Sequence, residues 1–106
     1  MDLRLDRTDR PDGTACLTIT GDIDLTSSDR FRRTVAGLVD DPAVTGVLLD
    51  AARLDFIDSN GVTVLVKAHR AAAERGICLR VTNAQDPVCG LLELLGVYEM
   101  LTGVRV

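Results

Sequence analysis

Leu54-Asp55-Phe56-Ile57-Asp58-Ser59-Asn60-Gly61 decides the fold of this chain, because the type of secondary structure changes within it. The apolar, strand-like part of the segment stops at Asp58. Beyond Gly61, residues recur at the spacing of one helix face: Val62, Leu65, Val66, His69 and Ala72. The pattern predicts a strand followed directly by a helix, with Ser59 at or just inside the helix N-terminus.

Ser59 has two possible roles at that position. The first turn of a helix carries unpaired backbone N–H groups and the positive end of the helix dipole. A serine hydroxyl there can cap the helix by accepting one of those N–H groups. It can also carry a phosphate, because the N-terminus of a helix favours an anion. The residues alone leave both roles open.

Length and composition predict one domain that spans residues 1–106. The chain is 46% hydrophobic but only 3% aromatic, which indicates a core of Leu, Val, Ile and Ala. Its net charge of −4 argues against nucleic-acid binding, which needs clustered Lys and Arg. No apolar run approaches the roughly 18 residues of a membrane span, and the N-terminus does not resemble a signal peptide. We therefore expect a cytoplasmic protein.

The three cysteines predict neither a disulfide framework nor a metal site. Cys16 and Cys78 lie in strand-like segments and Cys89 in a helical one, without motif spacing. With one histidine in the chain, zinc has almost no ligand set available. We expect all three cysteines to be small hydrophobic packing residues, and no cofactor or metal.

The first half of the chain predicts two strands, a helix and a third strand. Residues 3–5 and 15–19 alternate in polarity on either side of a turn at 9–13, as in a β-hairpin. Thr26 or Ser27 is placed to cap a helix that ends before Pro42. The continuously apolar run Val47-Leu48-Leu49 indicates a central strand that is covered on both faces, with Asp50 at its end.

The second half predicts helices on either side of a further strand. The helix after Ser59 should run to Arg75 and stop at Gly76, and residues 77–81 should form a strand. Asp86 should cap the next helix, with Pro87 as its first residue. Residues 97–106 fit a short helix or a terminal strand.

The predicted order is thus β-β-α-β-α-β-α. It defines an α/β fold of the α+β type, with a mixed sheet of four to five strands and three to four helices.

Three motifs in this order resemble those of the STAS domain family, specifically the stand-alone anti-sigma factor antagonists of bacteria. Gly21-Asp22-Ile23-Asp24 resembles the Gly-Glu-Leu-Asp signature of that family. Val47-Leu48-Leu49-Asp50, followed by Phe56-Ile57-Asp58-Ser59-Asn60-Gly61, resembles its central strand and Asp-Ser-Ser-Gly signature. Leu91-Leu92-Glu93-Leu94-Leu95-Gly96-Val97 resembles its last helix. The resemblance covers nearly the whole chain.

The resemblance implies a partner-switching function that involves Ser59. In such proteins an anti-sigma factor that is also a serine kinase phosphorylates the first Ser of Asp-Ser-Ser-Gly. The unphosphorylated form binds that partner and frees a sigma factor, and a phosphoserine phosphatase reverses the modification. The chain departs from the signature at Asn60, which replaces the second Ser and leaves Ser59 as the single hydroxyl of the motif.

The same resemblance implies a partner-binding surface made of two turns and the start of the helix after Ser59. Its expected residues are Asp22, Asp24, Thr26, Ser27, Asp58, Ser59, Asn60 and Gly61. A solvated turn is the alternative interpretation for Asp22 and Asp24. The sequence leaves monomer and dimer equally open.

A serine hydrolase does not fit the sequence. Ile57 stands where a nucleophile elbow has its first glycine. The single histidine, His69, lies ten residues along the same predicted helix, about 15 Å from Ser59 along its axis. We therefore expect no catalytic residues.

A receiver-like domain with Asp50 as phosphate acceptor and Asp22 and Asp24 as magnesium ligands is also disfavoured. Its fold lacks an opening hairpin, and no lysine follows the strand at 77–82.

The remaining alternative is a STAS scaffold or phosphorelay module, as in stressosomes, that does not act on a sigma factor. We expect no attachment to an anion transporter, another setting in which STAS domains occur, because this sequence contains no membrane span.

Overall fold

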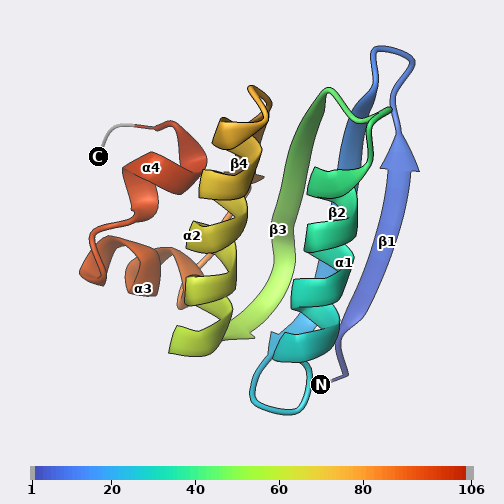
Figure 1. The fold of residues 1–106 in the computed structure, drawn as a ribbon. Helices are drawn as coiled ribbons and strands as arrows, with labels where there is room; N and C mark the ends of the chain where they lie inside the picture. The colour runs from blue at the N-terminus through green and yellow to red at the C-terminus, as the bar shows by residue number, and fades with distance from the viewer. Residues whose placement is uncertain (1, 105–106) are drawn as a thin grey trace.

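The computed structural model describes residues 2–104 and contains four strands and four helices (Figure 1). In chain order the elements are β1 Arg4–Asp9, β2 Thr14–Ile23, α1 Ser28–Asp40, β3 Gly46–Ile57, α2 Ser59–Glu74, β4 Cys78–Thr82, α3 Val88–Leu94 and α4 Tyr98–Thr102. This order confirms the predicted fold class, with α4 as an additional last helix.

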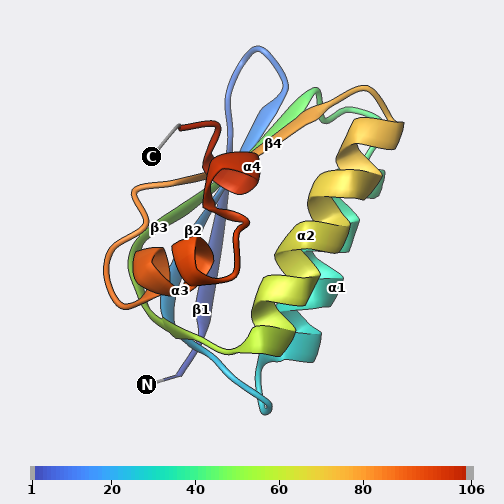
Figure 2. The ribbon, with the colours of Figure 1, turned by 90° about the vertical axis from the view of Figure 1, so that its left-hand side faces the viewer.

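The strands form one mixed sheet in the order β1-β2-β3-β4. β1 pairs with β2 in the antiparallel direction, whereas β2 with β3 and β3 with β4 are parallel pairs. Parallel neighbours need a crossover, and crossovers are almost always right-handed. Because both crossovers step in the same direction across the sheet, α1 and α2 lie on the same face (Figure 2).

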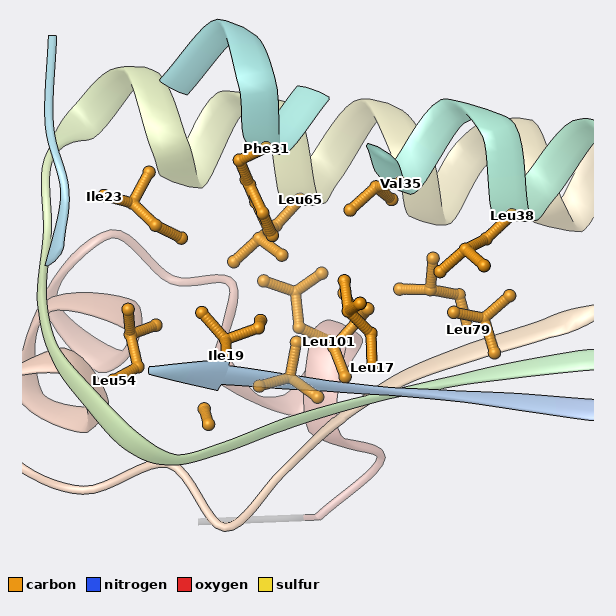
Figure 3. Packing of buried hydrophobic residues seen from close by; sticks show 14 of the residues in the cluster. Leu17, Ile19, Ile23, Phe31, Val35, Leu38, Leu54, Leu65, Leu79 and Leu101 are labelled. Carbon is orange, nitrogen blue, oxygen red and sulfur yellow. The ribbon is translucent and has the colours of Figure 1, made fainter. Parts of the chain in front are cut away.

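The hydrophobic core lies between that face and the helices (Figure 3). Along β2 the side chains alternate between buried and half-buried at every position. Phe31 of α1 is fully buried above the sheet, with Leu65 of α2 beside it. Leu101 brings the short α4 into the same cluster. Burial of these aliphatic side chains is the main force that holds the two layers together.

The prediction that β3 is covered on both faces is wrong. Val47 and Leu49 are fully buried, but Leu48 between them points to the opposite face and is only half-buried. β3 is flanked by β2 and β4, as predicted for a central strand. Its second face remains partly exposed because α1 and α2 both pack on the first.

Two predicted helix starts are also corrected. Ser27 occupies the N-cap position of α1, but neither its side chain nor that of Thr26 caps the helix. α3 begins at Val88, so Pro87 precedes the helix, while the Asp86 carboxylate accepts the Gly90 N–H at 3.0 Å.

The C-terminal region forms a helix, α4, rather than a strand; the last two residues of the range 97–106 lie outside the described residues. α2 ends at Glu74, one residue before the predicted end, and Gly76 follows with φ of 72°. None of the helices in residues 2–104 is long and apolar enough to cross a membrane.

The cysteines differ in their surroundings. Cys16 and Cys89 are half-buried, in partial agreement with a packing role, whereas Cys78 is exposed at the start of the edge strand β4. The packing interpretation is therefore wrong for Cys78. All three are free thiols.

We predict that Leu101→Ala lowers the free energy of unfolding by about 2–5 kcal/mol, because it empties a fully buried site. The matched control is Leu94→Ala, whose side chain is 81% exposed and should change stability by less than about 0.5 kcal/mol. Urea titration measures both. Equal effects of the two substitutions would show that α4 is not part of the core.

Candidate partner-binding surface

The two signature turns lie side by side at one end of the molecule. β2 and β3 are parallel neighbours, and Ile23 is in register with Ile57, so both strands end at the same edge of the sheet. The Asp58 N–H donates to the Ile23 carbonyl at 3.0 Å and joins the two turns directly. Figure 1 shows the β2–α1 loop and the start of α2 at this same end. The fold thus brings together two motifs that are far apart in the sequence.

Asp58, and not Ser59, caps α2. Asp58 has extended backbone angles, and its Oδ1 accepts the Gly61 N–H at 2.8 Å. Ser59 is the first helical residue and is exposed. Within residues 2–104 its hydroxyl has no hydrogen-bond partner. Of the two roles that the sequence left open, the structure therefore excludes the cap and leaves the Ser59 hydroxyl accessible.

Gly61 is required by close packing beneath this surface. A Cβ atom at Gly61 would lie 2.6 Å from Ile57 Cγ1 and 2.8 Å from Ile23 Cγ2, well inside van der Waals contact. The first turn of α2 therefore rests directly on the ends of β2 and β3. Gly61 is itself buried, so it positions its neighbours from below the surface.

The β2–α1 turn is held by its own side chains. The Asp24 Oδ1 accepts both the Thr26 N–H at 2.9 Å and the Thr26 hydroxyl at 2.6 Å. The Ser27 hydroxyl accepts the Asp24 N–H and donates to the Asp22 carbonyl, each at 3.0 Å. These bonds explain why Thr26 and Ser27 do not cap α1. They also present Asp24 in one fixed conformation.

Asp24 stays ionised at a lower pH than an ordinary carboxyl group, because its pKa is lowered. The hydroxyl of Thr26, followed by its backbone N–H, holds the pKa of Asp24 below its ordinary value. Asp22 and Asp58 add two further carboxylates to this end of the molecule, and Arg30 lines the same hollow as Asp22 and Asp24. Among the described residues, the ion pairs use Arg4, Arg7, Arg32 and Arg33, and they do not involve Asp24 or Asp58.

Asp50 lies apart from this surface. β3 continues beyond it to Ile57, so the prediction that Asp50 ends the strand is wrong. Its Oδ1 accepts the Ala52 N–H and the Asn83 side-chain amide, which links β3 to the end of β4. A receiver-like site shared by Asp50, Asp22 and Asp24 would need them at one edge of the sheet, and the structure does not place them so.

Sequence reasoning missed the exposed apolar residues at this end. Leu25, beside Asp24, is 78% exposed and Phe56 is 46% exposed, and in α3 Leu94 is 81% exposed. Phe56 stands next to buried Ile57 in an apolar run, and the run alone does not show which side chain points outward. An apolar residue in a polar turn, as at Leu25, is the signal that could have been used.

Comparison with known proteins defines the class. The STAS domain family matches residues 7–105, and the chain belongs to this family. The anti-sigma F factor antagonist of Paenibacillus polymyxa is 22% identical over 89 residues, which are 84% of this chain and 76% of that protein.

Two solved structures show how widely the fold is used. The anti-sigma factor antagonist SpoIIAA in its unphosphorylated form superposes with a TM-score of 0.76 at 19% identity, covering 90% of this chain and 83% of that one. The murine anion transporter Slc26a9 contains the same fold, with a TM-score of 0.72 at 22% identity over 86% of this chain but 15% of the transporter. At these identities the superpositions establish the fold alone.

We predict that Gly61→Ala lowers the free energy of unfolding by about 1–3 kcal/mol, because the added methyl group overlaps Ile57 and Ile23. The control is Gly37→Ala in α1, where a Cβ meets nothing within 4 Å and helix propensity should raise stability by up to about 1 kcal/mol. Denaturant titration compares them. Equal stability of both variants would contradict the packing described for α2.

We predict that Thr26→Val raises the pKa of Asp24 toward its ordinary value, because the strongest donor to the carboxylate is lost. NMR titration of the Asp24 carboxyl carbon measures the shift, with Thr63→Val as control. A carboxyl group whose pKa is lowered in the folded state stabilises the fold above its unfolded pKa of about 3.9. This contribution disappears as the pH falls through the folded pKa. Wild type should therefore be more stable than the variant above about pH 4, and this difference should disappear at lower pH. An unchanged pKa in Thr26→Val would contradict the network.

Proposed function

We propose that this protein is an anti-sigma factor antagonist that works by partner switching. Unphosphorylated, it binds an anti-sigma factor that is also a serine kinase, and a sigma factor is freed. When that partner phosphorylates Ser59, the antagonist and the anti-sigma factor separate. A phosphoserine phosphatase then restores the binding form. The accessible hydroxyl of Ser59 on the first turn of α2 carries this proposal, supported by the similarity to named antagonists.

The partner would supply the catalysis. Attack of the Ser59 Oγ on the γ-phosphorus of ATP forms a new P–O bond, breaks the bond to the β-phosphate and releases ADP. The hydroxyl proton passes to a base on the kinase. In this proposal the antagonist provides only the acceptor and its position, and it needs no enzymatic activity, cofactor or metal of its own. We place it in the cytoplasm, as expected from the sequence.

Neighbouring hydroxyls are less available than that of Ser59. Thr26 and Ser27 donate theirs to Asp24 and to the Asp22 carbonyl, and Thr63 donates to the Ser59 carbonyl at 3.0 Å. Asn60 removes the second hydroxyl of the signature. The kinase would therefore find one unengaged hydroxyl within the motif.

Charge explains how phosphorylation changes binding without changing the fold. A phosphate adds about −1.5 to −2 charges at neutral pH. The helix N-terminus tolerates that charge in the free protein. A partner that covers the surface would meet it together with Asp24 and Asp58 in a less polar environment, where uncompensated charge is costly. A partner that places no cation opposite Ser59 is repelled, and the resemblance to the antagonists supplies release as the direction of the switch.

We predict that Ser59→Glu binds the anti-sigma factor at least tenfold more weakly than wild type, whereas Ser59→Ala binds normally and remains bound when ATP is added. Titration calorimetry measures both. The control is Ala43→Glu, which adds the same charge at an exposed position in the α1–β3 loop at the opposite end. Equal affinity of Ser59→Glu and wild type would argue against the switch.

The alternative is a STAS scaffold or phosphorelay module. The same fold also occurs inside a much longer anion transporter, so the fold alone does not imply action on a sigma factor. Adding a preformed complex of sigma and anti-sigma factor discriminates the two. An antagonist displaces the sigma factor, whereas a scaffold binds its kinase and leaves that complex intact.

A further inference from the structure

An apolar groove opens between the end of β3 and α3, with a volume of about 340 Å³. We call it the α3 groove. It is lined by Phe56, Ile57, Pro87, Val88, Gly90, Leu91 and Leu94. Its lining contains no charged side chain. Phe56 on one wall and Leu94 on the other are large apolar residues left exposed, which marks such a surface as a binding site for an apolar group.

The α3 groove continues the surface that carries Ser59. Ile57 lines the groove and also packs against Gly61 in the first turn of α2. Phe56 precedes the capping residue Asp58 by two positions. Figure 2 shows α3 next to the end of β3. A partner large enough to cover Ser59 would therefore reach the groove.

Four acidic residues adjoin the groove-lining residues in the chain. Asp55 and Asp58 flank Phe56 and Ile57 in the chain, Asp86 precedes Pro87, and Glu93 precedes Leu94. In the part of the chain that the structure describes, none of these four acidic groups forms an ion pair. Asp86 lies at the groove itself, because its Oδ1 accepts the N–H of the lining residue Gly90 at 3.0 Å. An apolar lining with carboxylates beside it that form no ion pair favours an occupant of the complementary charge.

We infer that the α3 groove binds an apolar side chain of the anti-sigma factor, set in a segment with Lys or Arg on either side. The inference rests on the proposed function and adds a second anchor to it, beside Ser59. A second copy of this chain is a poor occupant, because its own groove would bring the same four carboxylates toward these four. A hydrophobic anchor in a well-packed pocket, surrounded by a polar rim, is a common arrangement at protein interfaces.

The test substitutes the most exposed wall residue. Leu94→Glu should weaken binding at least tenfold in titration calorimetry against each purified anti-sigma factor kinase of the source organism. Val104→Glu is the matched control, since Val104 is also exposed, at 54%, but lies beyond α4 and outside the groove. Glu93→Lys should weaken binding less and reduce its dependence on salt, because it replaces a negative charge beside the groove with a positive one. Far-UV circular dichroism confirms that each variant is folded.

Three results would overturn the inference in distinguishable ways. If Leu94→Glu binds like wild type while Ser59→Glu is weakened, the groove is not an anchor and the proposed function stands. If wild type binds none of the kinases, the proposed function fails and the groove assignment fails with it. If wild type is a dimer that Leu94→Glu converts to a monomer without loss of kinase affinity, a second copy occupies the groove.

Discussion

The packing of Gly61 on Ile23 and Ile57 is the constraint on which the functional end of the molecule depends. Only a residue without a side chain lets the first turn of α2 approach the ends of two parallel strands so closely. The hydrogen bond from the Asp58 N–H to the Ile23 carbonyl closes the same contact. Because β2 and β3 are neighbours, this one contact places Ser59 next to the Asp24 turn and next to the α3 groove.

That geometry gives Asp58 and Ser59 different roles. Asp58 caps α2 by accepting a hydrogen bond from the Gly61 N–H, so the Ser59 hydroxyl is not needed as a cap. Modification of Ser59 would then alter the charge of the surface without removing a cap. A regulated residue placed directly on a rigid helix end suits a protein that must exchange partners while its fold stays the same.

Much of the fold could be predicted from periodicity, because alternation at 15–19 and helical spacing after Gly61 report burial directly. The apolar run Val47-Leu48-Leu49 led to the wrong prediction that both faces of β3 are covered, since an apolar side chain can also lie on a half-exposed sheet face. That Asp58 caps α2 and that Ser27 does not cap α1 could not be predicted, because neighbouring polar residues compete for the same N–H groups and only the backbone angles decide. The α3 groove joins residues from distant segments, which no local pattern reveals.

The central claim is that Ser59 carries a reversible phosphate, and intact mass spectrometry of the protein from its native cells tests it most directly. Samples from growing and stressed cells are compared before and after phosphatase treatment, and the modified peptide is mapped. We predict one phosphate on Ser59 whose occupancy changes with condition. Unmodified protein under every condition would contradict the account and leave a constitutive binding role.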